Sequence, residues 1–200
     1  MVQNIQEASA FYGEYYRNIV EAADWVYTYL GQLSKNNPQL IAHVYHRIKS
    51  AESMTAKLHL RELEVTPHNA VSEMTDAVGF RIICGFLDDV YLLVKAITEE
   101  TSWWSVRMEK DYIRNVKPNG YRSYHIILDV ATAGGIIIPV ELQIRTIAQD
   151  AWASLEHQMK YKKEIKAKKL IERELKRCAD EMASTDITMQ TIRDLLEELE

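Results

Sequence analysis

Hydrophobic positions in the first part of the chain recur at spacings of three and four residues. From Ile5 to Leu30 this spacing predicts one long amphipathic helix, which ends at Gly31 and the Asn-Asn-Pro break at 36–38. The same periodicity, bounded by capping residues and breaks, predicts further helices over 50–64, 69–74, 88–100 and 146–162. The residues beyond 162 are helical by composition, so helices are expected at both ends of the chain.

Segments rich in β-branched and apolar residues lie between these helices. Residues 76–86, which read DAVGFRIICGF, are apolar almost throughout, a pattern typical of a strand buried on both faces. Further strands are predicted over 105–112, 124–130 and 136–145, and Gly134-Gly135 turns the last two into a hairpin. This order of elements predicts an α+β fold, with a sheet domain over about 40–160 flanked by N- and C-terminal helices.

Composition narrows the class of protein. The 200 residues are 47% hydrophobic and 26% charged, which is typical of a globular protein and excludes wholesale disorder. A net charge of −5 gives no basic field for duplex DNA, so no stable nucleic acid partner is expected. Cys84 and Cys178 are too isolated for a zinc site or a disulfide scaffold. Without a long apolar run or a signal peptide, we expect a reduced, cytoplasmic protein with no membrane partner.

Charge in the tail is segregated. Residues 160–177 hold nine basic and three acidic residues, whereas residues 178–200 hold one basic and seven acidic residues. The predicted N-terminal helix carries aromatic residues of the kind enriched at interfaces: Tyr12, Tyr15, Tyr16, Trp25 and Tyr27. We expect these surfaces to form a symmetric homo-oligomer. The alternative is a hairpin within one chain, in which the basic segment pairs with the acidic one.

The densest polar cluster, KPNGYRSYH at 117–125, lies between two predicted strands. Cationic side chains that can face a polyanion are Lys117, Arg122 and His125. Gly120 permits close approach of the backbone, and Tyr121 offers a flat surface on which a base can stack. The cluster is typical of a nucleotide-binding loop, and a polar solvated loop is the alternative.

Two acidic positions are candidates for a metal. Glu141, Gln143 and Arg145 share one face of a predicted strand, because strand residues alternate between faces. Glu141 is a candidate ligand of Mg²⁺, and a salt-bridged surface row is the alternative. Asp76 opens the strand at 76–86 as a second metal candidate or a simple cap. Its role depends on whether Glu141 lies nearby in space.

Basic and hydroxyl residues gather around position 50. Arg47 and Lys49 alternate onto one face, and Lys49, Ser53 and Lys57 recur at intervals of four, which makes one stripe if a helix includes all three. Like charges stacked in this way repel one another unless an anion lies between them. The pattern therefore predicts a phosphate-binding cradle.

Four segments together carry a resemblance to a known family. In chain order they read HRIKSAESMTAKL, NAVSEMTDAVGFRIIC, KDYIRNVKPNGYRSYH and VELQIRTIAQDAWASLEHQMKYK. They resemble the synthetase domain of the RelA/SpoT family, which makes the alarmones ppGpp and pppGpp, and cover residues 44–162. The chain has no room for the family's hydrolase and regulatory domains, so it is similar to the stand-alone small alarmone synthetases.

The resemblance implies a mixed-sheet, nucleotidyltransferase-like synthetase domain as the single domain of 1–200. Its divisions are an N-terminal helix over 1–36, a catalytic core over 40–162 and C-terminal helices over 163–200 that serve oligomerisation. Small synthetases of this family are often homotetramers, which agrees with the expected self-association.

The implied reaction transfers pyrophosphate from ATP to the 3′-hydroxyl of GDP or GTP and releases AMP. Arg47 and Arg81 would sandwich the adenine of ATP. The residues that would hold its phosphates are Lys49, Ser53 and Lys57. Asp76 and Glu141 would hold Mg²⁺, and Glu141 is also a candidate to take the proton from the attacking hydroxyl.

The resemblance also implies an acceptor site. Its residues would be Lys117, Asn119, Tyr121 and His125, with Tyr121 stacked on guanine, and Gln143 and Arg145 would lie between the two nucleotides. His157 matches a family position without an assigned role. The family motif usually reads Ser-Leu-His where this chain has Ser-Tyr-His, and Tyr124 is expected to point away from His125 into the sheet packing.

Two other functions stay open. Some relatives are toxins that transfer pyrophosphate to tRNA or make adenosine-based alarmones, and the shared motifs do not separate them from alarmone synthetases. A catalytically silent module that binds nucleotide or single-stranded RNA is the other alternative, with a helical scaffold as the plainest one. The presence of both Asp76 and Glu141 argues against a silent module, because binding alone needs no pair of metal carboxylates.

Overall fold

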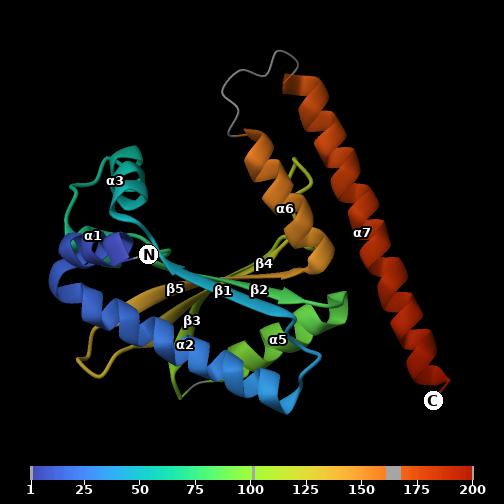
Figure 1. The fold of residues 1–200 in the computed structure, drawn as a ribbon, viewed down its shortest axis with the longest axis horizontal. Helices are drawn as coiled ribbons and strands as arrows, with labels where there is room; N and C mark the ends of the chain where they lie inside the picture. Colours follow the sequence, from blue (N-terminus) through green and yellow to red (C-terminus); the bar gives the residue numbers. More distant parts are fainter. Residues whose placement is uncertain (1, 101, 161–167, 200) are drawn as a thin grey trace.

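A five-stranded mixed sheet forms the centre of the computed structural model, which describes residues 2–100, 102–160 and 168–199 (Figure 1). Its strands are β1 (His43–Ile48), β2 (Val78–Cys84), β3 (Trp104–Asp111), β4 (Tyr124–Ala131) and β5 (Ile137–Thr146). They are ordered β1-β2-β5-β4-β3, and β2 and β5 are parallel while the other pairs are antiparallel. The predicted α+β class with a mixed sheet is confirmed.

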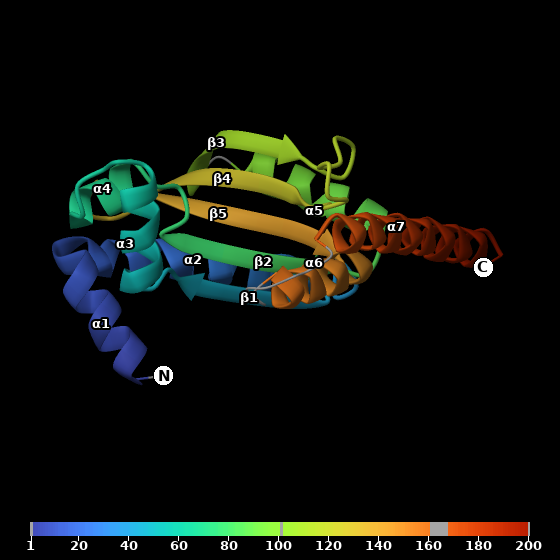
Figure 2. The ribbon, with the colours of Figure 1, turned by 90° about the horizontal axis from the view of Figure 1, so that it is seen from above.

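Helices cover the sheet unevenly. They are α1 (Val2–Tyr12), α2 (Tyr16–Asn36), α3 (Ala51–Leu60), α4 (Pro67–Ser72), α5 (Leu87–Glu99), α6 (Ile147–Lys160) and α7 (Lys168–Glu198). Helices α2 and α5 lie under one face of the sheet. Figure 2 shows the opposite face, which no described helix covers and which α3 and α4 flank at one end and α6 and α7 at the other.

The core lies between the sheet and the pair α2 and α5. Strand residues alternate, so every second side chain points into this layer. The largest of these are almost completely buried: Phe80, Ile82, Ile126, Leu128, Leu142 and Ile144. Burial of each such side chain contributes about 1.5–3 kcal/mol. The opposite side chains of the same strands are thereby left on the open face, where polar residues can gather.

The prediction of one helix over 5–30 is wrong. The chain breaks at Gly13, whose φ of 54° lies in the left-handed region, and a 3₁₀ turn over Gly13–Tyr15 separates α1 from α2. The break lets Tyr12 enter the core, where its hydroxyl donates to the carbonyl of Lys49 at 2.9 Å. Gly31 does not end the second helix, which continues to Asn36.

The proposed aromatic interface on this helix is also wrong in part. Tyr12 is buried, and the side chains that pack partly against the core include Tyr15, Tyr16 and Trp25. Of the five aromatic residues, Tyr27 alone is exposed, at 52%.

The prediction that the strand over 76–86 is buried on both faces is also wrong in part. Arg81 is exposed because its face of the sheet is the open one.

The tail is one continuous helix. Helix α7 has 31 residues and is about 46 Å long at 1.5 Å per residue. Its basic and acidic parts follow one another along this single helix. The alternative, a hairpin in which the basic part pairs with the acidic part, is therefore wrong for residues 168–198. The acidic part packs against α5 instead, and Arg193 pairs there with Asp89 at 2.8 Å. The rest of the basic segment, 161–167, lies outside the described residues.

Candidate active site

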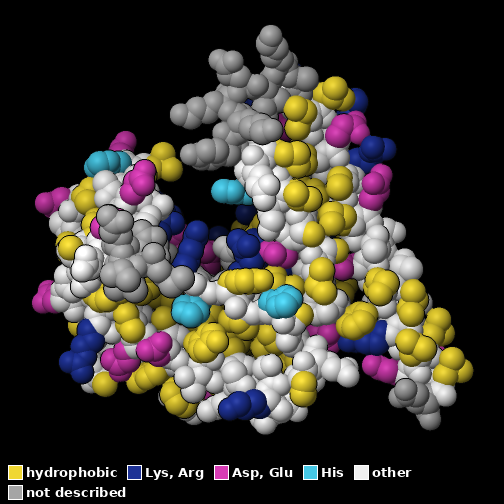
Figure 3. Space-filling view, in the orientation of Figure 1, with side chains coloured by type: hydrophobic (Ala, Val, Ile, Leu, Met, Phe, Trp, Pro, Cys, Tyr) yellow, Lys and Arg dark blue, Asp and Glu magenta, His cyan; other side chains and the backbone are white. Residues whose placement is uncertain are grey.

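The open face of the sheet carries a cavity of about 220 Å³. Its lining comes from β1, β2, β5 and the loop before β2: Tyr45, His46, Arg47, Lys49, Asp76, Gly79, Phe80, Arg81, Glu141 and Gln143. Figure 3 shows the molecule hollowed between the α3 side and the α6 side, with Lys and Arg side chains gathered in the hollow. An acidic chain thus presents a locally cationic cleft.

Strand register brings residues that are distant in the sequence onto one floor. Gly79 lies opposite Arg47 on one side and Glu141 on the other. One step along the strands, Gln143 lies between Arg81 and His125. Segments separated by up to about a hundred residues therefore contribute side chains to two adjacent rows of one face.

Asp76 is held by two lysines. Its carboxylate accepts from Lys49 Nζ at 2.8 Å and lies 2.7 Å from Lys57 Nζ. Burial alone raises the pKa of Asp76, but the hydrogen bonds and charges of the two lysines outweigh it and lower the pKa below its ordinary value. The Asp76 carboxylate is thus the anion that lies between Lys49 and Lys57 and offsets the repulsion of their like charges. Asp76 is therefore ionised at neutral pH.

The lysines are positioned by the backbone around the start of α3. Lys49 donates its backbone N–H to the carbonyl of Ala77 at 2.9 Å, which ties the end of β1 to the start of β2. Ser50 caps α3 by accepting from the N–H of Ser53. Ser53 itself is exposed and accepts a hydrogen bond from the Ser50 hydroxyl, and it does not line the cavity. The predicted stripe therefore converges through Lys49 and Lys57 only.

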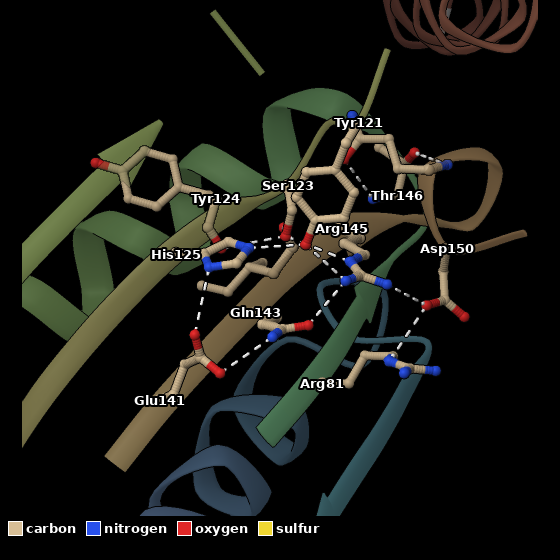
Figure 4. Close-up of polar contacts among 12 residues, drawn as sticks. Arg81, Tyr121, Ser123, Tyr124, His125, Glu141, Gln143, Arg145, Thr146 and Asp150 are labelled. Atoms are coloured by element: carbon tan, nitrogen blue, oxygen red, sulfur yellow. Dashed lines mark hydrogen bonds and ion pairs between the residues drawn. The ribbon is translucent and has the colours of Figure 1, made fainter. Parts of the chain in front are cut away.

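Glu141 is the end point of two hydrogen-bond chains that start at Arg145 (Figure 4). In one, Arg145 donates to Gln143 Oε1 at 2.8 Å and Gln143 Nε2 donates to Glu141 at 3.1 Å. In the other, Arg145 donates to the hydroxyl of Tyr121 at 2.7 Å, that hydroxyl lies 2.8 Å from His125 Nε2, and His125 Nδ1 lies 3.5 Å from Glu141. The five residues form a closed ring.

The ring determines the ionisation of Glu141. Burial raises the pKa of this carboxyl, and so does the negative charge of Asp76. The hydrogen bonds from His125 and Gln143 outweigh both, so the net pKa lies below its ordinary value. Asp76 and Glu141 line the same cavity and influence one another's charge. Asp76 therefore lies near Glu141 in space, as a role in metal binding requires.

Arg145 and Arg81 share a carboxylate that sequence reasoning missed. Asp150, in the first turn of α6, lies 3.0 Å from Arg145 Nη1 and 3.4 Å from Arg81 Nε. Ser123 was also missed, and its buried hydroxyl accepts from Arg145 Nε at 3.3 Å. An acidic residue in the first turn of a helix is typical of ordinary capping, so Asp150 had no distinguishing signal.

The loop at 117–125 is filled by its own side chains. Lys117 Nζ lies 4.2 Å from the ring centre of Tyr112 and 4.9 Å from that of Tyr121, while Arg145 lies 5.2 Å from the same Tyr121 centre. Asn119 donates to Glu156 of α6 at 3.2 Å. The predicted acceptor residues are thus adjacent to the cavity, and Gln143 is the one that lines it.

Helix α7 supports this loop. Arg122 turns away from the cavity and donates to the carbonyl of Ala179 at 3.3 Å and to Asp180 at 2.9 Å. Gly120 has a φ of 90°, and a Cβ there would lie 2.7 Å from the Cβ of Ala179. Tyr124 points away from His125, as predicted, and donates to Glu109 at 2.7 Å. His157 is exposed on α6.

Comparisons with known proteins agree with this geometry. A family model described as a region found in RelA/SpoT proteins matches residues 46–166. GTP pyrophosphokinase YwaC of Bacillus subtilis (strain 168) is 37% identical over an alignment of 172 residues that covers 82% of this chain and 80% of that protein. The crystal structure of small alarmone synthetase 2 from Bacillus subtilis is 33% identical, with a TM-score of 0.77 over 88% of this chain and 94% of that one.

A third structure carries a ligand. Small alarmone synthetase 1 from Bacillus subtilis, bound to its product pppGpp, is 28% identical with a TM-score of 0.75 over 90% of this chain and 94% of that chain. The present chain therefore belongs to the RelA/SpoT family, and the predicted type, a GTP pyrophosphokinase similar to the small alarmone synthetases, is confirmed. In the described part of the chain no helix combines the length and apolar character that crossing a membrane requires.

Enzymes of this pyrophosphokinase family use a divalent metal. Within residues 2–100, 102–160 and 168–199 no group of three or more His, Cys, Asp or Glu side chains could hold a metal ion by itself. Asp76 and Glu141 nevertheless form a pair of ionised carboxylates on one cavity. Hard cations such as Mg²⁺ bind through one or two carboxylates and complete their coordination with water and substrate phosphates. The residues present fit such an ion.

Proposed function

We propose that this protein transfers the pyrophosphate group of ATP to the 3′-hydroxyl of GDP or GTP and releases AMP. A bond forms between the 3′-oxygen and the β-phosphorus, and the bond from that phosphorus to the oxygen of the α-phosphate breaks. The observation that carries the proposal is the convergence of two ionised carboxylates with Arg47, Lys49 and Arg81 on one cavity, beside the Tyr121 loop. Bringing two polyanions together requires such a set of charges.

The cavity side is proposed to bind ATP. Arg47 and Arg81 come from adjacent strands and line the cavity, and their guanidinium groups are proposed to hold adenine between them. Lys49 and Lys57 are directed at Asp76, and ATP phosphates are proposed as the anions to which they would turn. Ser53 is proposed to add a hydroxyl near the start of α3.

Asp76 and Glu141 are proposed to hold Mg²⁺ in the complex with ATP. When bound, this ion supplies positive charge between the phosphates, which lowers the repulsion that an incoming nucleophile meets. The lowered pKa values of both carboxyls suit this role, because the ligands are ionised before the substrate arrives.

The loop side is proposed to bind the acceptor. Tyr121 is proposed to offer its ring to guanine, and Lys117 and His125, which lie beside that ring, are proposed to contact the acceptor phosphates. Asn119, Gln143 and Arg145 orient these groups. Glu141 is proposed to accept the hydrogen bond, and then the proton, of the 3′-hydroxyl at a carboxylate oxygen.

Product identification tests the proposal. The protein is incubated with ATP labelled at the γ-phosphate, Mg²⁺ and one acceptor at a time: GMP, GDP, GTP or tRNA. We expect label in a guanosine product with a 3′-pyrophosphate, together with an equal amount of AMP, from GDP or GTP. Label transferred to tRNA alone supports the toxin-type alternative, and the absence of AMP with every acceptor contradicts pyrophosphate transfer. A reaction without divalent metal contradicts the role of the two carboxylates.

We also propose a homotetramer in the cytoplasm, where ATP and GTP are plentiful. Support comes from large apolar side chains that remain exposed along the acidic half of α7: Ile187, Met189, Ile192, Leu195 and Leu196. Light scattering at micromolar concentration tests the assembly. A mass near four chains supports it, and a mass near the 23.2 kDa of one chain contradicts it. A charge introduced by Leu196→Glu is expected to lower the mass, whereas Leu60→Glu on α3 is the matched control.

A further inference from the structure

Asp150 contacts two arginines that are proposed to serve different nucleotides. Its Oδ1 atom lies 3.0 Å from Nη1 of Arg145 and 3.4 Å from Nε of Arg81. Arg81 lines the cavity proposed for ATP, whereas Arg145 holds the hydroxyl of Tyr121 on the acceptor side. Figure 4 shows the carboxylate between the two guanidinium groups, at the start of α6.

Arg145 depends on this carboxylate for charge balance. Its side chain is only 5% exposed, and a buried guanidinium without a counter-charge is strongly unfavourable. Its other hydrogen-bond partners are neutral: Ser123 Oγ, Tyr121 Oη and Gln143 Oε1. Asp150, at 20% exposure, is the anionic partner that the structure gives it. The position of Asp150 therefore sets the position of Arg145.

The same carboxylate also restrains Arg81, whose side chain is 44% exposed and has its ion pair with Asp150. A base stacked on Arg81 would immobilise this guanidinium and, through Asp150, the guanidinium of Arg145. Arg145 in turn fixes Tyr121 and Gln143. The side chains of Arg145, Tyr121 and Gln143 would then already be ordered when the acceptor binds. Acceptor binding is favoured because less conformational entropy is lost.

We infer that Asp150 is a positioning residue that couples the two nucleotide sites, so that ATP strengthens the binding of GDP or GTP and the reverse. This inference rests on the proposed assignment of the two sites. Because coupling between two binding equilibria is reciprocal, one measured enhancement determines the other. Asp150 touches neither substrate in this arrangement and acts through Arg81 and Arg145.

Calorimetry of GDP binding tests the inference, with and without a saturating non-hydrolysable ATP analogue and Mg²⁺. For the wild type we expect the analogue to raise GDP affinity by about 5- to 150-fold, the usual range of coupling between sites. Asp150→Asn retains the size of the side chain and removes its charge, and the enhancement is expected to fall close to onefold. Asp150→Glu is expected to restore part of it.

Asp89→Asn is the matched control. Asp89 pairs with Arg193 at 2.8 Å between α5 and α7, away from the cavity, so this variant loses a comparable ion pair and keeps the wild-type enhancement. Steady-state kinetics gives a second readout. At saturating ATP, the KM for GDP is expected to be higher in Asp150→Asn than in the wild type. At low ATP the two KM values should lie closer together, because coupling to bound ATP then contributes less in the wild type.

If Asp150→Asn does not fold, Arg81→Gln tests the same connection, because this variant keeps Asp150 as the counter-charge of Arg145. At saturating analogue this variant is expected to lose the enhancement of GDP binding. The inference is overturned by a folded Asp150→Asn or Arg81→Gln protein with the wild-type enhancement, or by a wild type without one. A wild type that shows the enhancement but transfers no pyrophosphate contradicts the proposed function alone.

Discussion

The two halves of the open face differ in how they are filled. On the cavity side, Lys49 and Lys57 hold Asp76 at the rim of an open space of about 220 Å³. On the loop side, two cations lie over the ring of Tyr121, and its hydroxyl belongs to a closed ring of hydrogen bonds. One side is thus open and charged, while the other is closed by its own side chains.

The difference teaches what each substrate must displace. On the cavity side, ATP phosphates would replace one internal anion, which exchanges one ionic contact for another. On the loop side, a base can stack on Tyr121 only after Lys117 gives up its place over the ring, while Arg145 stays in contact with it. Binding of the acceptor therefore includes a rearrangement that binding of ATP does not require.

Glu141 belongs to both halves, so its removal should have the largest effect. We expect Glu141→Gln to lower the rate of synthesis by about 100- to 10,000-fold, the range typical of a lost acid–base group. Its melting temperature should remain near wild type, because the residue lies on the open face and not in the core. Glu109→Gln, which contacts Tyr124 on the other face, is the control. Near-wild-type synthesis by Glu141→Gln rules out its catalytic role.

Gly120→Ala should disturb the loop side selectively. Its φ of 90° strains any other residue by about 1–2 kcal/mol, and the added Cβ would lie 2.7 Å from Ala179. We expect the KM for the acceptor to rise roughly 5- to 30-fold, with the KM for ATP unchanged. Ala179→Gly should relieve the contact but not the strain, and so restore part of the affinity. An equal rise in both KM values shows that α7 does not support the loop specifically.

Tyr121→Phe sharpens the comparison further. It keeps the stacking surface and removes the hydroxyl that orients His125 beside Glu141. We expect kcat to fall about 2- to 13-fold, equivalent to 0.5–1.5 kcal/mol for one hydrogen bond, without a rise in the acceptor KM. Steady-state kinetics at saturating ATP separates the two constants. A raised acceptor KM with unchanged kcat means that the hydroxyl serves binding and not orientation.

Lys57→Met tests the charge balance of the cavity side and has the smallest expected effect. The folded-state pKa of Asp76 is lowered, so its contribution to stability is complete above its unfolded value near 3.8 and is lost as the pH falls through the folded value. Loss of Lys57 raises this pKa, and the acid unfolding transition should move to higher pH. Urea unfolding at several pH values measures it, with Lys95→Met, whose side chain is exposed on α5, as the control for net charge. An unchanged transition means that Lys57 does not stabilise the carboxylate.

Much of this arrangement could be predicted from the sequence. Four of the five described strands were placed within two residues of their observed bounds, because alternation and turn residues are local signals, whereas no strand was predicted over β1. The repulsion of stacked like charges indicated that Lys49 and Lys57 face an anion, and the anion in the structure is the Asp76 carboxylate, whereas the predicted one was a phosphate. The four motifs together identified the family, and no single motif would have done so.

The remaining features depend on tertiary structure. Gly13 ends α1 at the point where Tyr12 enters the core, and the hydrophobic periodicity continues across this break. Arg81 lies in a run that reads as a buried strand, since a single sequence does not show which face a helix leaves open. Asp150 resembles an ordinary first-turn acid until the register of β2 and β5 brings Arg81 and Arg145 beside it.

Measurement of both KM values in Arg47→Ala and Tyr121→Ala tests the division of the cleft most directly. Loss of one stacking surface is worth about 1–3 kcal/mol, or roughly 5- to 150-fold in affinity. We expect Arg47→Ala to raise the KM for ATP by this factor and to leave the KM for the acceptor nearly unchanged, and Tyr121→Ala to show the opposite pattern. Equal increases of both constants in either variant would contradict the assignment of the open side to ATP and of the closed side to the guanine nucleotide.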